Sequence, residues 1–91
     1  MCAIAGIVSD NPSADPLVPA VSSMLEVQCH RGPDGRGLHC GPHAVLGHCR
    51  LAIIDLSEAG RQPMCDRLAR YWITFNGEIY NHVELRRELR E

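Results

Sequence analysis

The sequence lacks several features that would place the protein in other functional classes. No apolar run in its 91 residues approaches the ~20 residues that a membrane-spanning helix needs. The N-terminus has neither the basic region nor the apolar region of a secretory signal peptide. The formal net charge is only −2, so nothing indicates a nucleic acid or an anionic membrane as a partner. These absences predict a cytoplasmic protein.

The cysteines lack a recognisable spacing. Five are present, which is an odd number, and no two of them form a C-x-x-C pair. This distribution argues against both a disulfide framework and a zinc knuckle. Metal-ligand residue types are densest in the group His39, Cys40, His43, His48 and Cys49. The spacing of this group fits no common structural zinc site, so we expect reduced thiols and no bound metal.

Length and composition predict one small globular domain. The hydrophobic fraction is 45% and the charged fraction is 22%, which are ordinary values for a globular protein. A chain of 91 residues buries only about 60–65% of the surface that it exposes when unfolded, so its core is marginal. No internal repeat or low-complexity segment divides the chain.

Hydrophobic periodicity predicts a strand and a helix before residue 29. Residues 3–9 form a short apolar run, as expected of a strand buried on both faces, and this places Cys2 at the start of a strand. From Pro16 to about Gln28, apolar side chains recur every three or four residues, which is typical of a helix with one core-facing stripe. Pro16 suits the first turn of such a helix. The stripe consists of Leu17, Val21, Met24 and Leu25.

The middle of the chain is predicted to form a loop and then strands. Residues 30–37 hold three glycines and a proline, so we expect a loop, and its two arginines give it a basic rim. Residues 37–40 and 43–48 are predicted to pair as a hairpin around Gly41-Pro42, and residues 51–56 form a β-branched strand. Arg50 lies between the last two of these strands.

The last third of the chain is predicted to contain one strand and one helix. Residues 57–67 are polar and rich in turn residues, whereas residues 69–75 are β-branched and aromatic, as in a strand. Asn76-Gly77 is compatible with a type I′ turn, or with an extended or bulged strand whose backbone is exposed at Gly77. Asn81 then opens a helix, with Glu84 in the capping-box position, and the chain ends inside that helix.

Cys2 is the first candidate for a catalytic residue. If the initiator methionine is removed, Cys2 carries both a thiol and a free α-amine. An α-amine titrates at roughly 7.7–8.0 and is well matched to take a proton from a thiol of pKa near 8.5. An N-terminal residue of this kind supplies its own base, so no histidine is needed nearby.

Three further segments follow Cys2 in order: residues 30–37 (HRGPDGRG), 47–57 (GHCRLAIIDLS) and 75–82 (FNGEIYNH). Together with Cys2 they resemble the glutaminase domain of asparagine synthetases, a branch of the class II glutamine amidotransferases. The resemblance runs from Cys2 to about Leu89. It implies an α+β fold that forms part of the four-layer α/β/β/α sandwich of N-terminal-nucleophile (Ntn) hydrolases, with residues 1–91 as the N-terminal part of that domain.

The resemblance also implies a role for each motif. Cys2 attacks the side-chain amide of L-glutamine, and its α-amine moves the proton to the departing ammonia. The Asn76 amide and the backbone N–H of Gly77 form the oxyanion hole, Arg50 holds the α-carboxylate, and Glu78 accepts a hydrogen bond from the α-ammonium. The backbone of Leu51, Ala52, Ile53 and Ile54 lines the pocket. The family also uses an aspartate beyond the last helix, which this chain does not reach.

What lies outside the chain follows from the resemblance alone. A synthetase domain, absent here, would use ATP and Mg²⁺ to activate aspartate and would accept the ammonia; the 91 residues themselves need no cofactor. By itself we expect the chain to show little or no activity. Another amidotransferase of the same branch, or a non-catalytic fragment or interaction module, remains an alternative. The oligomeric state is open, with a homodimer among the options.

Two residues depart from the family pattern or complicate it. Ala3 stands where the family usually has glycine, which adds a methyl group beside the nucleophile. Cys49 lies next to Arg50 and offers a second thiol near the site, but it has no α-amine to activate it. Neither residue overturns the assignment of Cys2.

Overall fold

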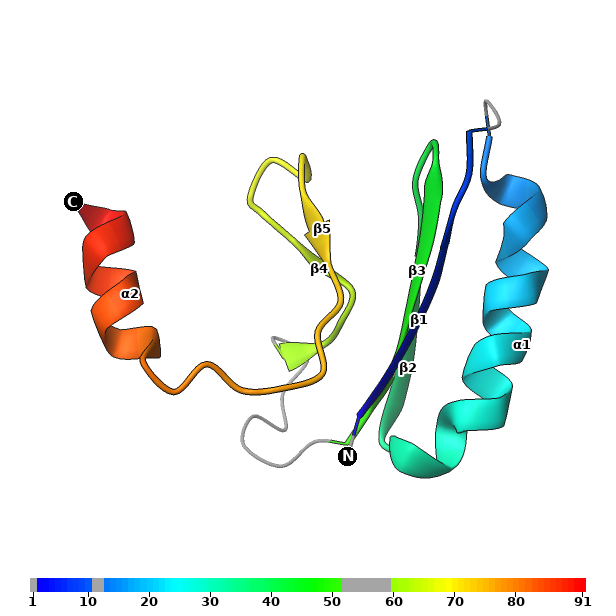
Figure 1. The fold of residues 1–91 in the computed structure, drawn as a ribbon, viewed down its shortest axis with the longest axis horizontal. Helices are drawn as coiled ribbons and strands as arrows, with labels where there is room; N and C mark the ends of the chain where they lie inside the picture. Colours follow the sequence, from blue (N-terminus) through cyan, green and yellow to red (C-terminus); the bar gives the residue numbers. More distant parts are fainter. Residues whose placement is uncertain (1, 11–12, 52–59) are drawn as a thin grey trace.

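The computed structural model describes residues 2–10, 13–51 and 60–91 and shows one helix against a three-stranded sheet, followed by a more extended C-terminal part (Figure 1). The radius of gyration is 14.3 Å, compared with about 12 Å for a compact domain of this length. In chain order the elements are β1 (Ala3–Val8), η1 (Asp15–Leu17), α1 (Val18–Gln28), η2 (Cys29–Arg31), β2 (Gly35–Cys40), β3 (Ala44–Arg50), β4 (Met64–Cys65), β5 (Trp72–Ile73) and α2 (His82–Arg90).

The sheet has the order β1-β3-β2, and both pairings are antiparallel. The predicted hairpin around Gly41-Pro42 is confirmed, because β2 and β3 pair on either side of it. β2 begins at Gly35, so the last residues of the predicted loop 30–37 are strand. Arg50 is the final residue of β3, so it lies within a strand that extends two residues beyond the predicted end at residue 48.

One face of the sheet packs against α1 and forms the core. Val21 and Leu25 of α1 are fully buried, and they pack against Val45 and Cys49 of β3. The other face of β1 is open, because its side chains alternate between buried and exposed and Val8 is 79% exposed. The prediction that this strand is buried on both faces was therefore wrong.

The helix begins two residues later than predicted. Asp15–Leu17 form a 3₁₀ turn that contains Pro16, and α1 starts at Val18. The core-facing stripe is confirmed for Val21 and Leu25, but Met24 is 39% exposed and does not fill the core. Met24 lies about 100° around the helix from Leu25, and this rotation turns it away from the sheet.

A second unit, formed by β4 and β5, lies against the open face of the sheet. Trp72 of β5 stacks on His39 of β2, with ring centroids 3.5 Å apart and an interplanar angle of 8°. The hydroxyl of Thr74 donates a hydrogen bond to the carbonyl oxygen of Gly47 at 3.3 Å. The sheet is thus covered by α1 on one face and contacted by residues 72–75 on the other.

Several predictions for the C-terminal third were wrong. The strand predicted over residues 69–75 is limited to Trp72–Ile73, because Ala69 adopts a left-handed conformation with φ 54°. Its partner β4 lies within the segment that was predicted to contain only turns. A type I′ turn at Asn76-Gly77 is ruled out, since neither residue has a positive φ. Residues 76–80 are not strand either, so the continued-strand alternative also fails.

The last helix, α2, begins directly after Asn81 as predicted, but the Asn81 side chain makes no capping hydrogen bond. Every side chain of α2 is exposed. The helix lies away from the sheet, at the far end of the molecule (Figure 1).

Most of the strand predicted over residues 51–56 falls outside the described residues. The elements confirm an α+β fold, and the four-layer sandwich stays a prediction. None of the described helices is long and apolar enough to cross a membrane.

The packing of α1 on β3 predicts unequal effects for two neighbouring side chains. Leu25→Ala should lower the free energy of unfolding by about 2–5 kcal/mol, because a fully buried leucine leaves a cavity. Met24→Ala should change it by no more than about 0.5 kcal/mol, because Met24 is exposed. Leucine and methionine have similar helix propensities, so denaturant titration of the two variants compares packing alone. Equal losses would contradict the described core.

Candidate active site

Cys2 lies at the end of the sheet where β1 begins and β3 ends. Because the two strands are antiparallel, the start of β1 is adjacent to Arg50 and the residue after it. The Cys2 sulfur accepts a hydrogen bond from the backbone N–H of Leu51 at 3.3 Å, and it lies 3.7 Å from the carbonyl oxygen of the same residue. Cys2 is half-buried, so its thiol is held in place yet open to small molecules.

Arg50, at the same end of β3, lines a pocket of about 210 Å³. The other lining residues are Asp34, Gly35, Arg36, Gly37, Arg61 and Gln62. Arginine predominates among the charged side chains around this pocket, and a guanidinium group matches a carboxylate in two parallel hydrogen bonds. The pocket is therefore suited to a small anionic group.

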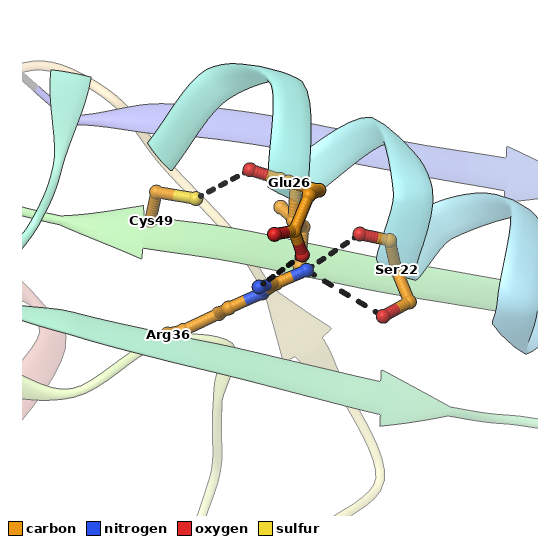
Figure 2. A network of polar contacts seen from close by, with 5 residues as sticks. Ser22, Glu26, Arg36 and Cys49 are labelled. Carbon is orange, nitrogen blue, oxygen red and sulfur yellow. Dashed lines mark hydrogen bonds and ion pairs between the residues drawn. The ribbon is translucent and has the colours of Figure 1, made fainter. Parts of the chain in front are cut away.

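The charge of Arg36 is directed to the opposite face of the sheet. Its guanidinium forms an ion pair with Glu26 at 3.1 Å and donates a hydrogen bond to the carbonyl oxygen of Ser22 at 2.6 Å, both on α1 (Figure 2). Arg36 thus ties β2 to α1. Arg61, which also lines the pocket, donates from Nη2 to the carbonyl oxygen of Arg36 at 3.4 Å.

Cys49, the second thiol near the site, also faces α1. Its Sγ lies 3.5 Å from the carbonyl oxygen of Leu25 and the residue is fully buried (Figure 2). Burial raises the pKa of the Cys49 thiol above its ordinary value, which leaves less thiolate at neutral pH. Cys2 and Cys49 therefore differ in exposure, since Cys2 is half-buried and Cys49 is fully buried.

Asn76 and Gly77 follow a segment that is anchored on the open face of the sheet. The carbonyl oxygen of Phe75 lies 3.2 Å from Nε2 of His48. The backbone N–H of Phe75 donates to Oε1 of Gln62 at 2.5 Å. Phe75 thus has both of its backbone polar groups bound by side chains. Asn76 and Gly77 themselves are exposed.

His48 is the most deeply buried polar residue of this face, with 1% of its surface exposed. A carbonyl oxygen only accepts hydrogen bonds, so Nε2 of His48 must carry the proton. Burial lowers the pKa of His48; the hydrogen bond to Phe75 raises it, and the positive charge of Arg50 lowers it again. The net direction is downward, so the imidazole is neutral at pH 7 with its proton on Nε2.

The sequence-predicted site residues are brought together only in part. Cys2 contacts Leu51, the residue that follows Arg50 at the end of β3. Asn76 and Gly77 are linked to β3 through Phe75. Glu78 is exposed. Ala52, Ile53 and Ile54 lie outside the described residues.

The sequence alone did not identify His48 and Gln62 as residues that bind the backbone of the segment on the open face of the sheet. His48 was considered only as a metal-ligand type, although its position two residues before Arg50 on an alternating strand places both on one face. The segment around Gln62 is rich in turn residues, and its sequence did not indicate a role for the Gln62 side chain. Within the described ranges no group of three or more His, Cys, Asp or Glu residues is arranged to hold a metal ion.

The chain matches the glutamine amidotransferase domain family over residues 1–91. It therefore belongs to that family. Among characterised proteins it is similar to the glutamine-hydrolysing asparagine synthetase 1 of Bacillus subtilis (strain 168), with 42% identity over 98% of the chain and 14% of the relative. It is also similar to asparagine synthetase B of Escherichia coli (strain K12), with 38% identity over 97% of the chain and 16% of the relative.

Relatives also occur in plants. A glutamine-hydrolysing asparagine synthetase of Zea mays is 51% identical over 67% of the chain and 10% of the relative. The chain spans about one seventh of the length of the bacterial relatives, which corresponds to the 14% and 16% coverage above. The match confirms the family that the four motifs predicted.

The pocket geometry predicts a strict need for glycine at position 37. A β-carbon at Gly37 would collide with the backbone carbonyl of Gln62, which cannot move without displacing the pocket wall. Gly37→Ala should therefore lower the free energy of unfolding by about 1–3 kcal/mol. Gly41→Ala is the matched control on the same hairpin, since its β-carbon would lie 3.6 Å from the nearest atom. Denaturant titration compares the two, and equal stability would contradict the close approach.

Proposed function

We propose that this chain is the nucleophile-bearing part of a glutaminase domain, in which Cys2 hydrolyses L-glutamine to glutamate and ammonia. The observation that carries the proposal is the position of the Cys2 thiol at the end of β3, where it contacts Leu51, the residue that follows the pocket-lining Arg50. Family membership supports it, because the matched family is that of the glutamine amidotransferase domains. A thiol can serve as the nucleophile for an amide carbon, and a guanidinium can bind the α-carboxylate of the amino acid.

The proposed reaction has two covalent steps. The Cys2 sulfur forms a bond to the amide carbon of glutamine, and the Cys2 α-amine takes the thiol proton and passes it to the departing nitrogen. The C–N bond breaks, ammonia leaves, and a γ-glutamyl thioester remains. Water then adds to the thioester, the C–S bond breaks, and glutamate is released with the thiol restored. This scheme requires that Met1 be removed, because only then is the amine of Cys2 free.

Binding and charge stabilisation are divided among three other positions. Arg50 would hold the α-carboxylate of glutamine in the pocket, and Glu78 would accept a hydrogen bond from the α-ammonium. The Asn76 side chain and the backbone N–H of Gly77 would donate to the oxyanion that develops on the amide carbonyl. Pre-aligned donors of this kind each contribute about 3–4 kcal/mol to lowering the barrier.

For the whole protein we propose a glutamine-dependent asparagine synthetase. The names of the relatives support this, since they are glutamine-hydrolysing asparagine synthetases. The ammonia would be used by a separate synthetase domain to amidate aspartate, and ATP and Mg²⁺ belong with that domain and not with these residues. Because Asn76 and Glu78 are exposed, we expect the 91 residues alone to show little or no activity.

The proposal predicts selective labelling of Cys2 by a glutamine-like electrophile. In the complete protein, diazo-oxo-norleucine should modify Cys2 and leave Cys65 unmodified, although Cys65 is exposed. In this proposal Cys2 is the thiol that reacts with bound glutamine, so exposure alone should not be enough. Peptide mass spectrometry locates the adduct, and intact mass should show that the active protein has lost Met1.

The matching variant tests the same assignment by activity. Cys2→Ala should abolish glutamine-dependent synthesis and leave synthesis from free ammonia intact. Cys65→Ala should leave both unchanged. Glutaminase activity that survives in Cys2→Ala, or full activity in a protein that retains Met1, would refute the role of Cys2.

A second prediction separates binding from chemistry. Arg50→Lys should raise KM for glutamine by about 10 to 100-fold with a small change in kcat, because a charged two-point contact is lost in ground state and transition state alike. Asn76→Ala should lower kcat by about 10² to 10³-fold with a smaller change in KM, because its donor acts on the developing oxyanion.

Steady-state kinetics of the complete protein with limiting and saturating glutamine measures both values. Arg70→Lys serves as the control for the arginine change, since Arg70 pairs with Asp66 at the surface and lies outside the pocket. A normal kcat in Asn76→Ala would show that the oxyanion hole lies elsewhere.

A further inference from the structure

The backbone of Phe75 is held on two sides by side chains that come from different parts of the chain. His48 of β3 binds its carbonyl oxygen at 3.2 Å, and Gln62 binds its N–H at 2.5 Å. The preceding residue, Thr74, is attached to β3 through its hydroxyl at 3.3 Å. These contacts begin where β5 ends, at Ile73. Because β5 pairs with β4 in a separate sheet, side-chain contacts hold residues 74 and 75 on β3.

The position of Phe75 determines where the next two residues lie. The carbonyl of Phe75 and the N–H of Asn76 belong to one planar peptide group, so fixing the oxygen also fixes the start of Asn76. From there, two rotatable backbone bonds lead to the N–H of Gly77. The anchor on Phe75 thus limits the directions in which the Asn76 side chain and the Gly77 N–H point.

Of the two anchoring side chains, His48 is the more deeply buried. His48 is 1% exposed, and its Nδ1 is buried without a hydrogen-bond partner among the described residues. Nε2 to Phe75 is therefore the one polar contact that the structure records for this ring. Gln62 lines the same pocket as Arg50. Burying an imidazole whose second nitrogen has no hydrogen-bond partner costs free energy. We therefore expect the position of the carbonyl that it binds to matter for function.

We propose that His48 and Gln62 are positioning residues, which together hold the Phe75 backbone so that Asn76 and Gly77 face the glutamine amide carbonyl. The inference rests on the proposed glutaminase function and assigns two residues to it that the motifs alone do not. In this scheme His48 acts on the peptide group that joins Phe75 to Asn76, and Gln62 acts on the peptide group that precedes Phe75. A displacement of about 1 Å at an oxyanion donor is enough to cost on the order of 10²-fold in rate.

The test uses pairs of variants that keep or remove the relevant hydrogen-bonding atom. His48→Gln retains an N–H donor and His48→Met removes it; Gln62→Glu retains an oxygen acceptor and Gln62→Met removes it. In the complete protein, each Met variant should lower kcat for glutamine hydrolysis by about 10 to 100-fold with less change in KM. The retaining variants should recover most of kcat, and synthesis from free ammonia should be unchanged in all four.

A double-mutant cycle with Asn76 separates positioning from general stability. If His48 and Gln62 act by orienting Asn76, their Met variants should lose most of their effect on kcat in an Asn76→Ala background. Should His48→Met fail to fold, the Gln62→Met cycle carries the test, because Gln62 is only half-buried. A purely structural role would lower kcat equally in both backgrounds, and that result, or a normal kcat in the Met variants, would overturn the inference.

The outcome also distinguishes this inference from the function on which it rests. If Asn76→Ala lowers kcat while His48→Met and Gln62→Met do not, the glutaminase assignment stands and the positioning role fails. If Cys2→Ala retains glutaminase activity, the proposed function itself fails and the positioning role fails with it.

Discussion

The central strand β3 imposes the constraint on which the rest of the molecule depends. It pairs with β1 on one side and β2 on the other, so its register sets the register of both neighbours. Its alternation sends Val45 and Cys49 into the core against α1 and leaves His48 and Arg50 for the opposite face. A slip of one residue would exchange the two sets and would bury the pocket arginine while exposing the core.

The parts of the fold that depend on local patterning could be predicted from the sequence. The helical stripe identified α1, the turn residues at Gly41-Pro42 identified the hairpin, and the position of Cys2 before an apolar run placed it at the start of a strand. Each of these features is set by residues within a few positions of one another. The boundaries were less accurate, because Pro16 in a 3₁₀ turn and Gly35 in a strand satisfy the same local rules as the predicted loop and helix start.

The parts that depend on contacts between distant residues could not be predicted. The strand β4 is two residues long and exists only because β5 lies beside it. The left-handed conformation of Ala69 has no sequence signal, since alanine does not favour it. Within the site, the family motifs predict roles for Cys2, Arg50 and Asn76, but nothing local relates Gln62 to Phe75, 13 residues away.

The most direct test of the proposed glutamine site is a crystal structure of the complete protein with Cys2 replaced by alanine and glutamine bound. We predict that the α-carboxylate lies against Arg50 and that the amide carbonyl oxygen lies about 2.7–3.1 Å from the Asn76 side-chain nitrogen and the Gly77 N–H. Phe75 should still be bound by His48 and Gln62. Glutamine bound away from the end of β3, or Asn76 directed away from the amide carbonyl, would contradict the proposed site.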